Sequence, residues 1–221
     1  MPNNFPAAVL WDMDGTLIDS EPYWLMSESR LAEDYGASWT EENGHELIGK
    51  SLYDSSALLK DRLSIQDLSV QQVIDRLTDE VVASLKQRLP WRPGALELLM
   101  DLKQNGIKTA LVTMSMRRMA LTVVEQIPFH AFDVVIAGDD VLRGKPDPEP
   151  YLKAAQALGV SASECIAFED SRTGLASAEA AGTFAIGVPN IVPIPAGPNR
   201  LVIPTLVGLN SARLAEMKSN V

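Results

Sequence analysis

Short, continuous apolar runs recur along the chain, and they limit the possible fold more than any other feature of the sequence. The runs are AAVLW (7–11), IKTALVT (107–113), DVVIAG (133–138), ECIAFED (164–170), TFAIGV (183–188) and, more weakly, LVI (201–203). A strand with one face in water alternates apolar and polar residues, and these runs do not alternate. Continuous apolarity instead indicates strands that are buried on both faces, as in a parallel sheet.

Stretches with the spacing of amphipathic helices lie between these runs. Residues 93–106, 149–160 and 172–182 carry apolar residues three and four positions apart, and a glycine stands at or near the end of each stretch. The apolar face expected for the first stretch consists of Leu96, Leu99, Met100 and Leu102. Strand and helix alternate four times, which predicts an α/β fold with a Rossmann-like parallel sheet and right-handed crossovers.

The alternation is interrupted after the first strand. Residues 20–89 show no strand pattern and contain charged amphipathic segments such as 69–89. We therefore expect an α-helical cap domain over 20–89, inserted into a core that consists of 1–19 and 90–221. The proline- and glycine-containing stretch LPWRPG (89–94) marks the return of the chain to the core.

Composition and charge exclude several classes of function. The 221 residues carry a net charge of −10, which would repel a nucleic-acid backbone or an anionic membrane, so we expect neither as a partner. Cys165 is the single cysteine, which excludes an internal disulfide and fits a reducing compartment. The first residues lack the basic segment of a signal peptide, and no run approaches the roughly 20 apolar residues of a spanning helix. We expect a cytoplasmic monomer.

The histidines leave little material for two common kinds of site. The chain contains only His45 and His130, which lie far apart in the sequence. A zinc site built on imidazoles or a Ser-His-Asp hydrolase would need at least one of them. Both are most simply explained as residues without a catalytic role.

Residues suited to binding a phosphoryl group and a metal follow four of the apolar runs. They are Asp12 and Asp14 after the first run, Thr113 and Ser115 after the second, Lys145 after the third, and Glu169 and Asp170 after the fourth. Taken singly, each has a plain structural explanation, because Asp-Gly steps form turns and carboxylates cap helices. Open α/β sheets bind ligands beyond the carboxyl ends of their strands, so we expect all seven to lie at one edge of the sheet.

These residue types share a chemical purpose. Carboxylates gathered in one crevice would repel one another unless a cation lay among them, and Mg²⁺ fits the oxygens of Asp12, Asp170 and the Asp14 carbonyl. A calcium-binding EF-hand is excluded because its glycine would stand at position six of the loop. Thr113, Lys145 and backbone N–H groups would hold a phosphoryl group. One carboxylate could then attack phosphorus, and another could protonate the leaving oxygen.

Four ordered motifs resemble those of a known superfamily. DMDGTLIDS (12–20 with its neighbours), Thr113 in LVTMS, Lys145 in GKPDPEPY and FEDSRTG are similar to the haloacid dehalogenase superfamily, in the branch with a helical cap after the first motif. That branch includes sugar-phosphate phosphatases and β-phosphoglucomutases. The resemblance spans residues 7 to about 190.

The resemblance implies a role for each of the motif residues. It implies Asp12 as nucleophile, Asp14 as general acid and base, Thr113 and Lys145 as phosphate-binding residues, Asp170 as a magnesium ligand, and Glu169 as a ligand or as a partner of one. Dehalogenases of the superfamily lack the second aspartate of the first motif, because a departing halide needs no proton. The presence of Asp14 therefore indicates phosphoryl transfer.

A second phosphate-binding pattern occurs inside the expected cap. GHELIGKS (44–51) matches the P-loop pattern G-x-x-x-x-G-K-[ST]. A P-loop must follow a buried strand, whereas the preceding residues are polar, and Glu46 would place negative charge inside the phosphate cradle. The sequence favours a bend between two cap helices, with contact of Lys50 or Ser51 to a substrate as a further possibility.

Two cap positions bear on the choice between a phosphatase and a mutase. In the β-phosphoglucomutases a histidine follows the first motif and a cap arginine holds the second phosphate, whereas the corresponding positions here carry Trp24 and Leu52. The stretch DSEPYW instead resembles sugar-phosphate phosphatases, although Trp24 is equally consistent with the core of the cap. The candidate specificity residues are Glu21, Trp24, Lys50 and Ser51.

These observations lead to one favoured function and two alternatives. We expect a Mg²⁺-dependent phosphatase that hydrolyses a small, sugar-like phosphomonoester through an aspartyl-phosphate intermediate. The alternatives are a β-phosphoglucomutase-like sugar-phosphate mutase and a non-catalytic, phosphate-responsive binding protein. A receiver-like module would share the acidic pair and the lysine, but it would have neither a cap nor this length.

Overall fold

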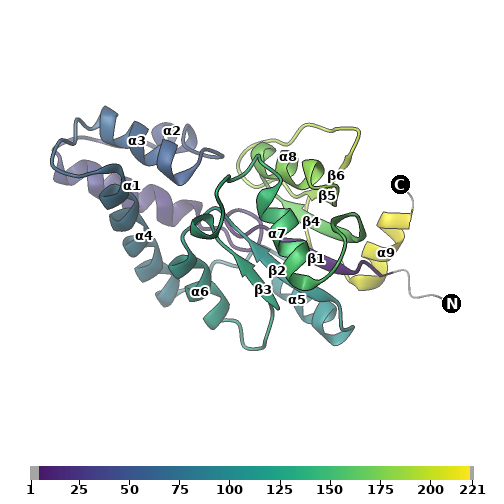
Figure 1. Cartoon of the computed structure of the whole chain (residues 1–221). Helices are drawn as coiled ribbons and strands as arrows, with labels where there is room; N and C mark the ends of the chain where they lie inside the picture. Colours follow the sequence, from purple (N-terminus) through teal and green to yellow (C-terminus); the bar gives the residue numbers. More distant parts are fainter. Residues whose placement is uncertain (1–4, 220–221) are drawn as a thin grey trace. The chain divides into compact units, whose positions relative to one another are not determined.

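A computed structural model describes residues 5–219 of the chain, which contain a six-stranded parallel sheet (Figure 1). The strands are β1 (Ala8–Trp11), β2 (Lys108–Val112), β3 (Val134–Ile136), β4 (Cys165–Glu169), β5 (Phe184–Gly187) and β6 (Arg200–Val202). Their order is β3-β2-β1-β4-β5-β6, and all neighbouring strands are parallel. Each strand overlaps one of the predicted apolar runs, and the predicted α/β class is confirmed.

Helices cover the sheet and account for its continuous apolar runs. The helical segments outside the insertion are α5 (Ala95–Gln104), α6 (Arg117–Glu125), η1 (Gly138–Asp140), α7 (Glu149–Leu158), η2 (Ala162–Glu164), α8 (Arg172–Ala180) and α9 (Ser211–Ser219). Helix α7 packs against β1, β2 and β3, while α8 packs against β4 and β5. Every residue of β1 and β4 is buried, as expected for central strands covered on both faces.

The buried face of α5 differs from the predicted one. Leu99 and Leu102 are buried as expected, but Leu98 is buried in place of Met100, which is 41% exposed. Leu96 is only partly buried. Apolar residues occupy more than one side of this helix, so their spacing defines two overlapping faces, and packing against β2 selects between them.

The described chain separates into two compact units. The sheet unit joins the chain up to Asp19 with the chain from Trp91 onward, and the helical unit is Ser20–Pro90. The sequence placed Pro90 in the core, whereas here it groups with the helices. The helical unit contains α1 (Glu21–Asp34), α2 (Glu41–His45), α3 (Leu52–Arg62) and α4 (Val70–Gln87).

The helical unit has a hydrophobic core of its own. Leu31, Leu59, Ile65 and Val73 are completely buried in this core. The longest helix, α4, begins at a capping box in which Ser69 and the residue three positions later satisfy each other's backbone N–H groups. Local capping and an apolar face therefore both favour these helices.

A buried carboxyl group makes the stability of the helical unit depend on pH. Glu28 is 7% exposed, and its Oε2 accepts a hydrogen bond of 2.9 Å from Trp39 Nε1. Burial raises the pKa of Glu28 to about 7, although the Trp39 hydrogen bond opposes the shift. Because the folded-state pKa lies above the unfolded value, the folded protein binds the proton more tightly, and its stability falls as pH rises through this range.

We expect Glu28→Gln to stabilise the protein in alkaline but not in acidic solution. The amide removes a buried charge that is costly above pH 7, and its oxygen can still accept from Trp39. The gain in unfolding free energy is expected to reach about 3 kcal/mol at pH 8 and to stay below about 1 kcal/mol at pH 5. Thermal melting at both pH values measures it. Glu33→Gln, on the exposed side of the same helix, is the matched control, and an equal gain from both variants would contradict the assignment to Glu28.

Candidate active site

The strand order places the candidate residues at the switch point of the sheet, where the chain stops adding strands on one side of β1 and begins to add them on the other. The chain runs from β1 outward to β2 and β3, and then returns to add β4 on the other side of β1. Ligands of open α/β sheets bind at the carboxyl ends of the strands beside such a switch point. Asp12 directly follows β1, and its N–H donates to Phe168 O in β4 at 3.1 Å. Asp12 and Glu169 therefore end adjacent strands.

A buried lysine lies between these two carboxylates. Lys145 Nζ is 2.6 Å from Asp12 Oδ1 and 2.6 Å from Glu169 Oε1. The same ammonium donates to Val112 O at 2.9 Å, so these three acceptors match its three N–H groups. The lysine side chain is only 5% exposed. Three strand ends are thus joined through a single cation.

Two hydroxyl groups complete the surroundings of Glu169. Tyr151 Oη, which is fully buried, donates to Glu169 Oε1 at 2.6 Å, and Ser171 Oγ donates to Oε2 at 3.2 Å. A Cβ at Gly174 would lie 1.9 Å from Oε2, so the first turn of α8 leaves room for this carboxylate only because residue 174 is glycine. The arrangement holds Glu169 in one orientation, facing Lys145.

The charges in this cluster shift one another's protonation. Burial, followed by the Glu169 carboxylate, raises the pKa of Asp12 to about 7, while Lys145 opposes that rise. Burial alone would lower the pKa of Lys145, but the two carboxylates raise it above its ordinary value. Lys145 therefore stays protonated at neutral pH, and it favours the ionised form of Asp12.

Asp14 occupies a separate position beside the second strand. Ser115 Oγ donates to Asp14 Oδ2 at 2.7 Å, and Thr113 Oγ1 donates to the same oxygen at 3.3 Å. Thr113 Oγ1 also accepts from Ser115 N at 3.0 Å. Asp14 is partly exposed, whereas Asp12 is buried. The two aspartates, one residue apart in sequence, therefore have different surroundings.

Three acidic side chains could together hold a metal ion. Single oxygens of Asp12, Glu169 and Asp170 all lie within 4.8 Å of one another. A Cβ at Gly15 would lie 2.0 Å from Asp170 Oδ2, so the glycine of the DGT turn makes the space in which this carboxylate lies. Hard carboxylate oxygens at such spacing fit Mg²⁺.

Lys145 lies in a loop that packs on the segment after β2. Lys145 N lies 3.3 Å from Met114 Sδ, and a Cβ at Gly144 would lie 2.8 Å from the same sulfur. A Cβ at Gly138 would lie 2.3 Å from Met114 O. The loops after β2 and β3 can approach each other this closely because both contact points are glycines.

Comparison with known proteins identifies the family. Residues 9–188 match the family model described as haloacid dehalogenase-like hydrolase. The chain belongs to this family. The predicted resemblance is confirmed, and so is the prediction that the chain is an enzyme, a phosphatase of this superfamily.

Two phosphatases and one solved structure are similar to this haloacid dehalogenase-like hydrolase over most of its length. The phosphorylated carbohydrates phosphatase of Thermotoga maritima is 36% identical over 176 residues, which cover 79% of this chain and 81% of the relative. The validoxylamine A 7'-phosphate phosphatase of Streptomyces hygroscopicus is 34% identical, covering 81% of this chain and 84% of the relative. The crystal structure of CbbY from Rhodobacter sphaeroides in complex with phosphate superposes with a TM-score of 0.83 at 26% identity, over 94% of this chain and 98% of CbbY.

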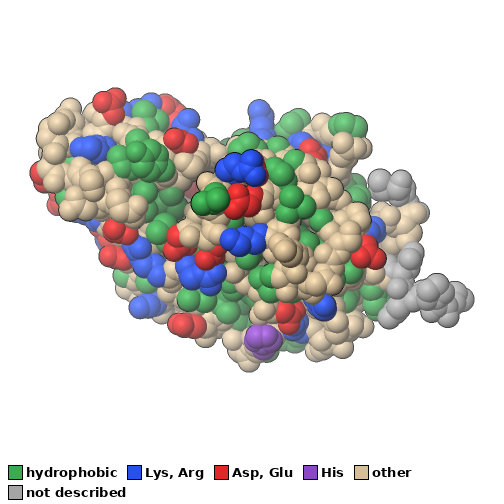
Figure 2. Space-filling model, in the orientation of Figure 1, with side chains coloured by type: hydrophobic (Ala, Val, Ile, Leu, Met, Phe, Trp, Pro, Cys, Tyr) green, Lys and Arg blue, Asp and Glu red, His purple; other side chains and the backbone are tan. Residues whose placement is uncertain are grey.

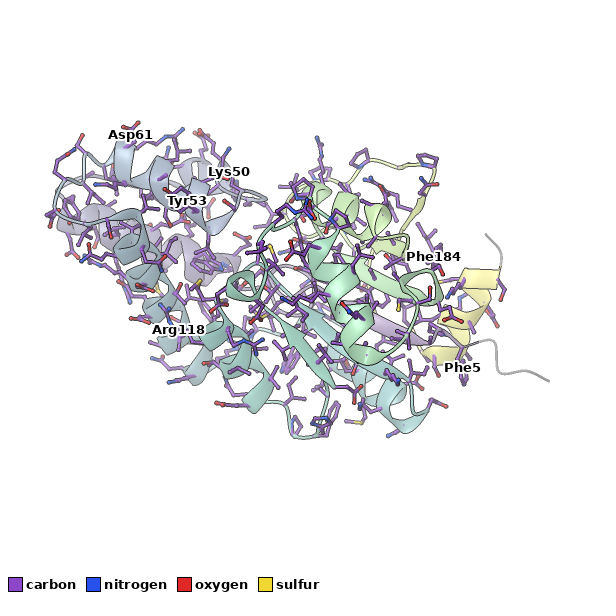
Figure 3. All side chains as sticks on the ribbon, in the orientation of Figure 1. Phe5, Lys50, Tyr53, Asp61, Arg118 and Phe184 are labelled. Carbon is purple, nitrogen blue, oxygen red and sulfur yellow. The ribbon has the colours of Figure 1, made fainter. Side chains whose placement is uncertain are left out.

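The candidate specificity residues of this hydrolase lie in its helical unit. Trp24 is partly buried and packs against the unit's own core, as one of its two sequence interpretations held. Lys50 is exposed in the turn before α3, and Tyr53, in the first turn of that helix, is 62% exposed (Figure 3). Ser51 caps α3 by accepting from Asp54 N at 3.0 Å. Glu21 begins α1 and is partly buried.

The P-loop pattern of this hydrolase does not have P-loop surroundings. Residues 44 and 45 end α2, residues 46–50 form the turn that follows, and Ser51 caps α3; no strand precedes them in the described part of the helical unit. The bend between two helices that the sequence favoured is what the structure contains.

Sequence reasoning assigned no role to Tyr151 and Ser171, although both lie in the quoted motifs and both hydroxyls donate to Glu169. A signal existed for Ser171 alone: a serine that starts a helical pattern is a typical N-cap, and here its Oγ accepts from Gly174 N.

His45 and His130 are both exposed, at a helix end and in a loop. Among residues 5–219, no helix combines the length and apolar character needed to traverse a bilayer.

Proposed function

We propose that this enzyme is a Mg²⁺-dependent phosphatase that hydrolyses small, sugar-like phosphomonoesters through an aspartyl-phosphate on Asp12. The observation that carries the proposal is the Asp12–Lys145–Glu169 cluster at the switch point of the sheet, where Lys145 Nζ is 2.6 Å from each carboxylate. In such a cluster the cation favours the ionised form of an otherwise costly buried carboxylate and can also receive a phosphoryl group.

The proposed reaction divides the work between the two aspartates. Asp12 attacks phosphorus, and the bond between phosphorus and the leaving oxygen breaks as the aspartyl-phosphate forms. Asp14 gives a proton to the leaving oxygen and later takes one from the water that hydrolyses the intermediate. The Thr113 and Ser115 hydroxyls donate to Asp14 Oδ2 and so orient this carboxylate for both tasks.

The residues around Asp12 fit a magnesium ion. We assign the side chains of Asp12 and Asp170 and the main-chain carbonyl of Asp14 as its ligands. Glu169 adds negative charge, while its own oxygens accept from Lys145, Tyr151 and Ser171. When bound, the ion would offset negative charge on the transferring phosphoryl group.

The substrate class rests on the relatives and on the charge of the chain. The phosphatases that are 36% and 34% identical are named for phosphorylated carbohydrates and for validoxylamine A 7'-phosphate. The net charge of −10 disfavours nucleic-acid substrates. On the face shown in Figure 2, basic and acidic side chains are interspersed, without a broad basic patch. We therefore propose a small phosphorylated metabolite as substrate. We also propose, as expected from the sequence, that the enzyme is a cytoplasmic monomer.

A substrate panel tests the proposal. With Mg²⁺, the enzyme should release inorganic phosphate from hexose or pentose monophosphates, and a chelator should reduce the rate to background. Calcium should substitute poorly, because its longer bonds and higher coordination number would misplace the nucleophile. Full activity in chelator would refute the role of the metal, and lack of activity on every phosphomonoester would refute the phosphatase.

Phosphorus NMR of the products separates hydrolysis from isomerisation. The positions of Trp24 and Leu52 lack the histidine and arginine expected of a mutase, and Lys50 offers a single flexible cation that grips phosphate less specifically than arginine. We expect free phosphate to exceed isomerised sugar phosphate, with and without a bisphosphate primer. If β-glucose 1-phosphate were converted into glucose 6-phosphate faster than free phosphate is released, the enzyme would be a mutase and the phosphatase proposal would be wrong.

A further inference from the structure

One asparagine side chain outside the acidic cluster links three separate segments of the sheet unit. Asn190 lies in the loop after β5, and its Nδ2 donates to Asp19 Oδ1 at 3.0 Å. The guanidinium of Arg92 donates to Asn190 Oδ1 and also to Pro189 O, the latter at 2.9 Å. Asn190 is therefore the common partner of an acidic and a basic side chain that are 73 residues apart in sequence (92 − 19).

Asp19 and Arg92 lie on the two stretches of chain that flank the helical insertion. Within the sheet unit, these stretches also pair through their backbones. Ile18 forms an antiparallel bridge with Trp91, and Arg92 N donates to Leu17 O at 3.0 Å. Asn190 thus holds the ends of a short two-stranded ribbon against the loop that follows β5.

The ribbon is continuous with the turn that carries Asp14. Gly15 N donates to Ile18 O at 2.7 Å, and Asp14 forms a bridge with Ile18. Ile18 is therefore bonded to the Asp14–Gly15 turn on one side and to the returning chain on the other. The loop that bears Asn190 is anchored to the acidic cluster as well, because Val188 N donates to Glu169 O at 2.7 Å.

We propose that Asn190 is a positioning residue for the acid–base step: by fixing Asp19 and Arg92, it holds the ribbon that sets the place of Asp14. This inference rests on the proposed role of Asp14 as the proton donor to the leaving oxygen. Asn190 itself lies outside the acidic cluster and acts only through the ribbon.

The chemistry of the amide explains why an asparagine suits this position. A carboxamide offers an acceptor and a donor on one planar group, and here the acceptor faces a guanidinium while the donor faces a carboxylate. An aspartate would place a second negative charge against Asp19, and a basic residue would repel Arg92. A neutral group with both functions satisfies the two charged partners at once.

The test compares two substrates that differ in their need for a proton donor. A sugar phosphate releases a weakly acidic alcohol and needs protonation of the leaving oxygen, whereas p-nitrophenyl phosphate releases a stable phenolate and does not. The parameter is kcat/KM, which covers attack and departure of the leaving group but not the later attack by water. Asp14→Asn sets the benchmark for complete loss of the acid.

Asn190→Ala should lower kcat/KM for the sugar phosphate by about tenfold, the scale expected when a catalytic group is displaced by part of an ångström. For p-nitrophenyl phosphate the loss should be less than about threefold, since the leaving phenolate needs no proton from the Asp14 side chain. Asn105→Ala removes a comparable amide, which donates to Asp101 O at 2.9 Å at an exposed helix end. This variant should leave kcat/KM unchanged for both substrates.

Hydrogen exchange gives a readout that does not depend on activity. The Gly15 amide, bonded to Ile18 O, should exchange faster in Asn190→Ala than in the wild type and in Asn105→Ala. Should Asn190→Ala fail to fold, Asn190→Ser, which keeps a small polar group, is expected to show a smaller shift in the same direction.

The outcomes separate this inference from the proposed function. If Asp14→Asn lowers kcat/KM equally for both substrates, Asp14 is not the acid, and the positioning role of Asn190 is overturned as well. If Asp14→Asn lowers kcat/KM selectively for the sugar phosphate but the Asn190 variants do not, or if the exchange rate of the Gly15 amide is unchanged, only the positioning role is overturned. Selective loss with the sugar phosphate together with faster Gly15 exchange supports it.

Discussion

Asp12→Asn should abolish hydrolysis while the protein remains folded. The amide has nearly the shape of the carboxylate but is a poor nucleophile, so the covalent route is lost. We expect turnover to fall by about 10⁴- to 10⁶-fold, the range seen when a hydrolase loses its nucleophile. Phosphate release gives the rate, and mass spectrometry of acid-quenched wild type should find a hydroxylamine-sensitive phosphoryl group on Asp12. Neither signal should survive in the variant.

The control for this substitution is Asp61→Asn. Asp61 is exposed at the end of α3 in the helical unit, so the same chemical change there should leave the rate as it is. Thermal melting should show that both variants are folded. Substantial turnover by Asp12→Asn, with deamidation back to aspartate excluded by mass, would refute Asp12 as the nucleophile.

The strands were predictable because burial on both faces leaves a continuous apolar signal. Residues 8–11 and 165–169, the two central strands that flank the switch point, are buried throughout. The edge strand β6 is only partly buried, and it gave correspondingly the weakest run. Helix α5 shows the limit of this reasoning: its apolar residues fit two faces, and only packing decided that Leu98 and not Met100 is buried.

The candidate site was predictable to the extent that topology alone brings strand ends together. Asp12 and Glu169 come from the ends of adjacent strands, so their closeness follows once the strands are parallel and in this order. The contact of Lys145 with both carboxylates depends also on the loop that carries the lysine from the edge strand β3. The separate surroundings of Asp14 were not predictable. The sequence predicted that both aspartates lie at one edge of the sheet, but it did not predict that Asp14 lies in a turn held by its own hydrogen bonds.

Partners contributed by distant loops left no signal in the sequence. Tyr151 reaches Glu169 from a helix face that reads as ordinary apolar packing. Asn190 lies in a proline-rich loop that predicts nothing but irregular backbone. A hydrogen bond depends on the meeting of two atoms, and residue type at either end does not specify the partner. Such contacts can be identified only from the three-dimensional structure, and in this chain they orient the site residues that the sequence predicted.

Lys145→Met should damage both activity and stability, because it removes the cation shared by Asp12 and Glu169. Methionine keeps an unbranched side chain of similar length, so the loss is mainly that of charge. Two buried carboxylates would then face each other without a cation, and removing one partner of a buried ion pair typically costs about 3–5 kcal/mol. We expect kcat/KM to fall by about 10³-fold, the scale of losing a group that stabilises charge in the transition state. Steady-state kinetics and thermal melting measure the two effects.

The loss of stability in Lys145→Met should grow as pH rises. Burial and Glu169 raise the pKa of Asp12 to about 7, and Lys145 is the group that opposes this rise. Without the lysine the folded-state pKa would lie higher still, so ionisation of Asp12 would oppose folding at every pH above its unfolded value near 4. The difference in Tm from wild type should therefore be smaller at pH 5 than at pH 8. Lys103→Met is the matched control, because Lys103 Nζ pairs with Asp133 at 2.8 Å in a partly exposed position, where an ion pair contributes less than about 1 kcal/mol. A Lys145→Met enzyme with normal kinetics, or with a stability loss no greater than that of Lys103→Met, would show that the buried cation does not hold the two carboxylates together.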